Sequence, residues 1–113
     1  MKVPFLDLRA AHAELGRELA EAFRRVVDSG QYILGEEVAA FEREWAAYCG
    51  AACCVGVASG LDALHLGLRA LGVGPGDEVI VPSNTYIATW LAVSWAGAVP
   101  VPVEPDPRTF NLD

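Results

Sequence analysis

Residues 53–103 read CCVGVASGLDALHLGLRALGVGPGDEVIVPSNTYIATWLAVSWAGAVPVPV, and this stretch decides the fold. It contains three continuous apolar runs, which are typical of strands buried on both faces of a sheet. The runs are residues 53–58, 79–81 and 99–103. Between them, residues 61–71 and 85–96 have helical character, and each segment is followed by a stop signal, Gly72 or Gly97. The order strand, helix, strand, helix, strand predicts an α/β domain with a mainly parallel sheet and flanking helices.

Two further helices are predicted upstream of this stretch. Residues 11–28 place apolar side chains on one face at helical spacing, and Gly30 follows as a stop signal. Residues 36–48 show the same spacing and end at Gly50. A short apolar link, QYILG at 31–35, joins the two helices.

The apolar share of the chain bears on its domain organisation. At 53% it slightly exceeds the usual share in globular proteins. Such a surplus fits a fragment whose apolar faces expect more chain, and it also fits a buried oligomer interface. We expect a helical segment over residues 1–50 and the start of an incomplete α/β domain over residues 51–113.

Composition also excludes several classes of protein. The net charge is −7, Lys2 is the only lysine, and no arginine cluster forms a basic stripe, so binding of nucleic acid is not expected. The apolar stretches are too short for a membrane span. Acidic residues occur too early for a secretory signal, which makes the reducing cytoplasm the expected compartment. Cysteine spacing indicates no metal site, and Cys53 and Cys54 are expected to be small core residues.

The turn from the first strand into its helix is the strongest candidate site. It reads Ala58-Ser59-Gly60-Leu61-Asp62. The first amides of a helix are unpaired and carry the positive end of its dipole, so they attract phosphate, and Gly60 has no Cβ to keep an anion away. The alternative is a capping box, because Ser59 and Asp62 have the S-x-x-D spacing. Both can hold at once if Ser59 caps one amide and those of Gly60 and Leu61 stay free.

The second strand-to-helix turn, VPSNTY at 81–86, is a weaker candidate. Turns at the carboxyl ends of parallel strands are where ligands bind in α/β proteins. Tyr86 has two possible roles, stacking on a flat ring or packing into the core. Ser83 and Thr85 can equally serve as helix caps.

Other candidate motifs receive structural interpretations. The glycine-rich run 72–77 follows a helix and precedes a strand, the reverse of the order in a dinucleotide-binding fingerprint, so a tight connection is predicted. His12 and His65 have no partner at metal-site or catalytic-triad spacing. They are expected to be ordinary surface or packing histidines.

Taken in order, several motifs resemble the DegT/DnrJ/StrS family of nucleotide-sugar aminotransferases, which depend on pyridoxal 5′-phosphate (PLP). The resemblance covers nearly the whole chain, and the ordered set is specific although each motif alone is weak. The motifs are FLDL (5–8), YILGEEV (32–38), SGLDAL (59–64), GPGDEVIVP (74–82), SNTYIAT (83–89), GAVPV (97–101) and FNLD (110–113). The resemblance implies the amino-terminal part of the large domain of the fold type I PLP-dependent transferases.

The resemblance also implies roles for individual residues. Ser59, Gly60 and Leu61 match the segment whose main-chain amides hold the PLP phosphate. Many members have threonine at the position of Leu61, so a hydroxyl contact is missing here. Tyr86 matches the aromatic residue that stacks on the pyridine ring, and Tyr32 falls where the family contacts its nucleotide-sugar substrate.

No catalytic residue is assigned within the chain. Lys2 matches no family lysine, so we expect the Schiff-base lysine, and the acid that pairs with the pyridine nitrogen, beyond Asp113. The implied reaction aminates a keto group on a nucleotide-linked deoxysugar, with similarity to the dTDP-3-keto-hexose aminotransferases and with glutamate as the amino donor. A homodimer is implied, with no nucleic-acid or membrane partner.

Three alternatives remain open at the level of sequence. Sugar 3-dehydratases of the same family carry histidine in place of the lysine, and the deciding position is absent from this chain. A short non-catalytic binding module could keep the phosphate site without chemistry. A nicotinamide-binding domain is a third alternative, although its glycine fingerprint is missing.

Overall fold

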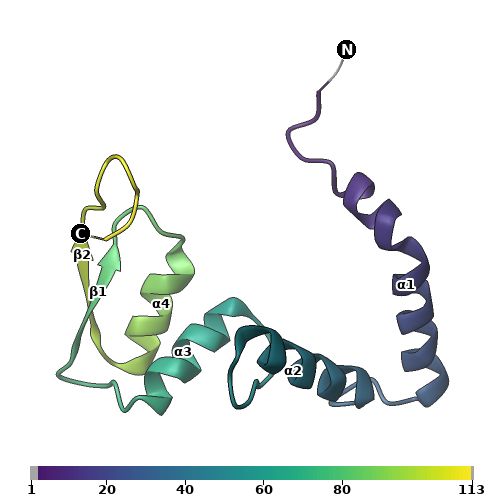
Figure 1. Ribbon diagram of the computed structural model, residues 1–113. Helices are drawn as coiled ribbons and strands as arrows, with labels where there is room; N and C mark the ends of the chain where they lie inside the picture. The colour runs from purple at the N-terminus through teal and green to yellow at the C-terminus, as the bar shows by residue number, and fades with distance from the viewer. Residues whose placement is uncertain (1–2, 113) are drawn as a thin grey trace. The chain divides into compact units, whose positions relative to one another are not determined.

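The computed structural model describes residues 3–112, so Lys2 lies outside the described residues. The chain divides into two compact units, Met1–Gly56 and Val57–Asp113. Figure 1 shows the helices and strands of each unit.

The first unit contains two helices. α1 spans Leu8–Ser29, starting three residues before the predicted helix, because the Asp7 side chain accepts a hydrogen bond from the Arg9 amide and caps it. Gly30 ends α1 in the left-handed conformation, at φ 66°. α2 spans Glu36–Cys49.

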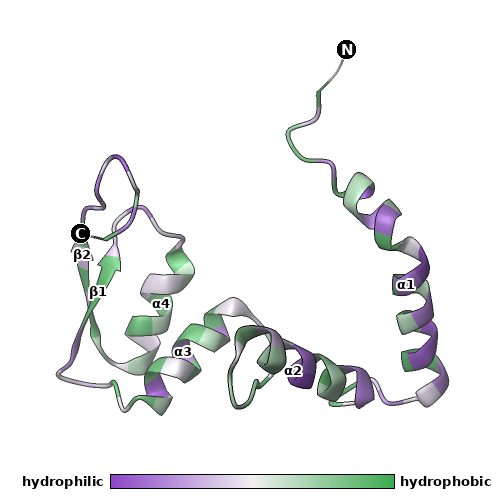
Figure 2. Ribbon diagram, viewed as in Figure 1, coloured by the Kyte–Doolittle hydropathy of each residue, from purple (hydrophilic) through white to green (hydrophobic). Residues whose placement is uncertain are grey.

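The apolar face of α1 is exposed. Figure 2 shows hydrophobic and hydrophilic turns alternating along this helix, as its sequence spacing predicts. None of its residues is buried. The exposed large side chains are Leu8, Leu15, Leu19, Phe23 and Val27.

The second unit has the alternating order predicted from the sequence, except for its first strand. α3 (Gly60–Ala70) is followed by β1 (Glu78–Pro82), α4 (Ile87–Ala96) and β2 (Val99–Val103). β1 and β2 run parallel in register, with Glu78 opposite Val99 and Pro82 opposite Val103. The α/β class and the parallel sheet are confirmed.

A small apolar core lies between the sheet and its helices. Val81 of β1, Val93 of α4 and Ala98 are buried and form one cluster. The partly buried side chains packed against this cluster are Leu68, Val73, Val79 and Trp90. The core fixes the strand β1 and the helices α3 and α4, and therefore the two turns that lead into these helices.

The strand predicted at residues 53–58 is not formed. Among the described residues only β1 and β2 pair, and residues 53–57 have no regular structure. Cys53 is exposed and Cys54 half-buried, so neither is the core residue that the sequence predicted. A strand depends on a neighbour to satisfy its backbone groups, and this run has none within residues 3–112.

The start of α4 also differs from the prediction. The helix begins at Ile87, two residues later than expected, because Tyr86 is extended at φ −68° and ψ 147° and serves as its N-cap. Ser83 and Thr85 are therefore not the caps. The Thr85 hydroxyl instead lies 3.1 Å from the Thr89 hydroxyl.

The glycine-rich run is the tight connection that the sequence predicted. Gly74 donates its amide hydrogen to the Asp77 carboxylate at 2.9 Å, and the Asp77 amide donates to the Gly74 carbonyl at 3.1 Å. His65 packs edge-on against Trp95, with ring centroids 6.0 Å apart.

Candidate functional site

The turn into α3 holds the candidate phosphate site. Ser59 is extended and caps the helix: its hydroxyl oxygen accepts a hydrogen bond from the Asp62 amide at 3.1 Å. The Ser59 carbonyl accepts from the Ala63 amide at 3.0 Å. These bonds use the third and fourth amides of the helix. Within residues 3–112, no acceptor pairs with the amides of Gly60 and Leu61. The predicted cap is confirmed, and two donors remain at the positive end of α3.

Space around Gly60 is open. A Cβ built at this residue would meet no protein atom within 4 Å, so the backbone can be approached from that side. The Asp62 carboxylate is held by the Ser59 hydroxyl, which donates to its Oδ2 atom at 2.9 Å. The hydroxyl hydrogen of Ser59 is thus directed at Asp62, and the free main-chain amides are the donors left for an anion.

A pocket of about 580 Å³ joins the turns that lead into α3 and α4. Its lining comes from the first turns of α3 and α4: Ser59, Gly60, Leu61, Leu64, Tyr86, Ile87, Ala88 and Leu91. The structure therefore brings together all four residues predicted to bind the cofactor. Four apolar side chains of this lining, from Leu64, Ile87, Ala88 and Leu91, were not predicted, because helical spacing alone does not distinguish a pocket wall from a core face.

Tyr86 is oriented outward. The residue is 79% exposed, so within the described residues Tyr86 does not pack into the core. The ring stands at the N-terminal end of α4 and lines the same pocket as the free amides of α3. Two unpaired main-chain donors and an exposed flat ring in one pocket fit a phosphorylated aromatic molecule such as PLP.

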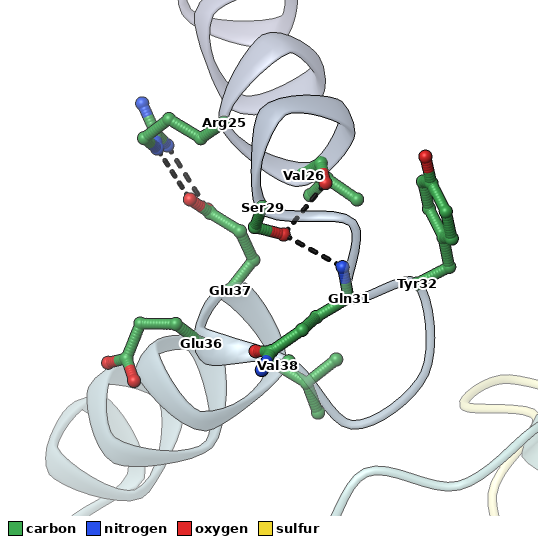
Figure 3. Close-up of a pocket in the computed structure, with 9 residues that line it drawn as sticks. Arg25, Val26, Ser29, Gln31, Tyr32, Glu36, Glu37 and Val38 are labelled. Atoms are coloured by element: carbon green, nitrogen blue, oxygen red, sulfur yellow. Dashed lines mark hydrogen bonds and ion pairs between the residues drawn. The ribbon is translucent and has the colours of Figure 1, made fainter.

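Tyr32 lies in the other unit, in the link between α1 and α2. It is 70% exposed and lines a pocket of about 200 Å³ that also includes Arg25, Ser29 and Glu37. Figure 3 shows Tyr32 beside this pocket, on the opposite side from the ion pair between Arg25 and Glu37.

The Arg25–Glu37 ion pair is a feature that the sequence analysis missed. The Arg25 side chain donates from Nε to one carboxylate oxygen of Glu37 and from a terminal nitrogen to the other at 3.1 Å. The hydrogen bond and the opposite charge raise the pKa of Arg25, and the hydrogen bond from Arg25 lowers the pKa of Glu37. The pair joins residues on two different helices, so neither helical periodicity nor i,i+4 spacing could reveal it.

Within residues 3–112, none of the helices is both long and apolar enough to cross a bilayer. The same residues contain no group of three or more His, Cys, Asp or Glu side chains placed to hold a metal ion.

Comparison with known proteins gives consistent matches over the whole chain. A dTDP-3-amino-3,4,6-trideoxy-alpha-D-glucose transaminase of Streptomyces venezuelae is 65% identical over 112 residues, covering 99% of this chain and 30% of the relative. Among solved structures, S. venezuelae DesV in complex with a ketimine intermediate superposes with a TM-score of 0.93 at 62% identity, covering 99% of this chain and 30% of that one. NtdA of Bacillus subtilis with bound cofactor PMP gives 0.91 at 35% identity, covering 99% and 26%.

The chain thus spans about a third or less of the length of these relatives. Residues 13–113 match the DegT/DnrJ/EryC1/StrS aminotransferase family. The matched residues include the turns into α3 and α4 and the pocket between these turns. With the expected fold, the expected turns and matches along its whole length, this chain belongs to the DegT/DnrJ/EryC1/StrS aminotransferase family.

Proposed function

We propose that this chain supplies the phosphate-binding and ring-stacking part of a PLP site in an enzyme that aminates a nucleotide-linked 3-keto-deoxysugar. The observation that carries the proposal is a pocket lined both by Tyr86 and by Gly60 and Leu61, whose amides have no acceptor among the described residues. The cofactor of the B. subtilis relative and the sugar named for the S. venezuelae relative support it.

Each residue of the pocket has a defined task in this proposal. The amides of Gly60 and Leu61 bind the phosphate, helped by the positive end of the α3 dipole. Ser59 fixes the first turn of α3 through its cap and so holds those amides in place. Tyr86 stacks on one face of the pyridine ring and excludes water from it. When bound, PLP supplies the electron-withdrawing ring that makes amino transfer possible.

Substrate and assembly belong to the same proposal. Tyr32 contacts the nucleotide sugar, glutamate provides the amino group, and the enzyme works as a homodimer in the cytoplasm. The family resemblance supports the first three statements. The three cysteines, none of them in a disulfide within the described residues, are typical of proteins from a reducing compartment.

A hybrid enzyme provides the direct test. In it, this chain replaces the matching 112 residues of the S. venezuelae transaminase. We expect the hybrid to bind PLP, measured by its visible absorbance, and to aminate a dTDP-3-keto-hexose with glutamate. A folded hybrid that binds no PLP would refute the assignment of the pocket. A hybrid that binds PLP without aminating the sugar would refute the assigned reaction.

The isolated 113-residue chain should not form the covalent adduct with PLP, because its single lysine is at position 2 and matches no family lysine. After incubation with PLP and borohydride reduction, we expect no specific stoichiometric labelling by mass spectrometry. Stoichiometric labelling at one site of the folded chain would contradict this expectation.

A further inference from the structure

The link between α1 and α2 is held by hydrogen bonds at both of its ends. The Ser29 hydroxyl donates to the Val26 carbonyl at 2.8 Å and accepts from the Gln31 amide at 3.0 Å, which fixes the exit from α1. At its other end the Gly35 carbonyl accepts from the amides of Val38 and Ala39, at 3.1 and 3.2 Å. Both ends of residues 30–35 are therefore anchored to helix termini.

The middle of the link combines a strained backbone with side chains that are exposed in this chain. Leu34 has φ 51°, a left-handed conformation that costs a residue with a Cβ free energy. At Gly35, a Cβ would lie 2.9 Å from the Gln31 carbonyl oxygen, so the chain folds back on itself there. Yet Tyr32, Ile33 and Leu34 are 70%, 85% and 82% exposed. A strained backbone persists only where the surrounding structure holds it, and such strain clusters at functional sites.

The Arg25–Glu37 ion pair is the one side-chain bridge across the link among the described residues. It joins the last turns of α1 to the first turn of α2 with two hydrogen bonds between a planar guanidinium and a carboxylate. This two-point geometry fixes orientation as well as distance. It closes the loop that contains Tyr32.

We propose that Arg25 and Glu37 are positioning residues that hold the α1–α2 link in the conformation that presents Tyr32 to the nucleotide sugar. The inference rests on the proposed function, because it takes Tyr32 as a substrate contact. Neither residue touches the substrate in this proposal: they act through the link. An exposed ion pair adds little to overall stability. Its loss should therefore change substrate binding more than it changes folding or cofactor binding.

The first test is kinetic and uses the hybrid enzyme described above. For Arg25→Gln and for Glu37→Gln we expect KM for the nucleotide sugar to rise about fivefold, the effect of losing one well-oriented ion pair. We expect kcat and PLP absorbance to remain within about twofold of the parent. The exchanged pair Arg25→Glu/Glu37→Arg should recover most of the lost affinity. Arg43→Gln is the matched control, because it breaks an ion pair with Glu36 that lies within α2.

The second test needs no activity and uses the chain itself. Hydrogen exchange of the Gln31 and Val38 amides reports on the two anchors of the link. Both amides should exchange faster in Arg25→Gln and in Glu37→Gln than in the unmodified chain and in Arg43→Gln.

These results separate failure of the inference from failure of the proposed function. Unchanged exchange and unchanged KM, or a KM effect no larger than that of Arg43→Gln, would overturn the positioning role. Faster exchange with unchanged KM would also overturn it, because the link would then not position a substrate contact. An unmodified hybrid that fails to aminate the sugar would instead overturn the proposed function, and the exchange measurement would still decide whether the pair holds the link.

Discussion

Gly60 combines two properties that are rarely combined in a helix. It is the first residue of α3, where glycine weakens the helix, and its open side leaves the backbone amides approachable. A methyl group there would meet no protein atom but would occupy the space an anion needs. The described residues leave room for a side chain at this position, and the proposed function gives glycine a role there, an approachable backbone for the phosphate.

Substitution Gly60→Ala should therefore separate stability from cofactor binding. We expect the thermal midpoint of the hybrid apoenzyme to stay the same or rise slightly, since alanine favours helix. PLP affinity should fall about tenfold or more, because hydrogen bonds to a charged group are each worth about 1.5–3 kcal/mol. Equilibrium dialysis and thermal melting measure the two effects. Unchanged affinity would show that the phosphate does not bind at this turn.

Substitutions of Tyr86 test whether its ring stacks on the cofactor. Its ring is exposed and its hydroxyl has no hydrogen-bond partner among the described residues, so the flat face is the useful part. Tyr86→Phe should keep PLP affinity within about twofold, whereas Tyr86→Leu should lower it about fivefold, in line with the energy of an aromatic pair. Fluorescence titration of the two hybrid variants with PLP measures both affinities. Equal loss in the two variants would point to the hydroxyl instead.

The elements differ in how well sequence alone could predict them. The sequence predicts α2, α3, β1 and β2 to within one residue at every end, because glycine stop signals and continuous apolar runs are local signals. Residues 53–58 carry the same apolar signal, yet they form no strand. A strand depends on a partner elsewhere in the chain, and local composition does not say whether that partner is present.

In the candidate site, too, local features could be predicted from the sequence and contacts between distant residues could not. Ser59 and Asp62 could be predicted as a cap because their spacing is local, and the structure confirms the cap. The proximity of Tyr86 to Gly60 was implied only by the family resemblance, since it depends on how α3 and α4 pack. The Arg25–Glu37 pair spans two helices and left no periodic signal at all.

Acid should weaken the ion pair between α1 and α2. The hydrogen bond from Arg25 lowers the pKa of Glu37, so the stabilisation is complete above the ordinary pKa of a glutamate and is lost as pH falls through the lowered value. Because the pair is exposed, the melting temperatures of the chain and of Glu37→Gln, followed by circular dichroism, should differ only slightly at pH 7, and the difference should shrink as pH falls below the ordinary glutamate pKa. A difference that persists in acid would mean that Glu37 acts through something other than its charge.

At the scale of the whole molecule, one edge of the two-stranded sheet is open to pairing with another strand. The Val99 amide donates to the Asp77 carbonyl, so alternate residues of β2 face β1 and the intervening Pro100 and Pro102 face away. Proline has no amide hydrogen, which blocks pairing on the outer side of β2. The edge of β1 that does not pair with β2 carries no proline between Glu78 and Val81, so its amides can pair with another strand. Ile80 on that strand is 61% exposed.

The isolated chain should therefore associate through β1. We expect sedimentation to show oligomers whose share rises with concentration. Ile80→Lys should reduce them, because a charge on an edge strand opposes pairing. The proline-bearing strand offers the control: Val99→Lys on β2, which is 54% exposed, should have a smaller effect. A monodisperse monomer of the unmodified chain would contradict this prediction.

Every residue that lines the larger pocket falls between positions 59 and 91, while Tyr32 belongs to the other compact unit. A single genetic crossover on either side of that interval moves the pocket intact between family members. The link between α1 and α2 lies outside that interval. Under the proposed function, evolution can vary the segment assigned to sugar recognition while inheriting the proposed cofactor pocket unchanged.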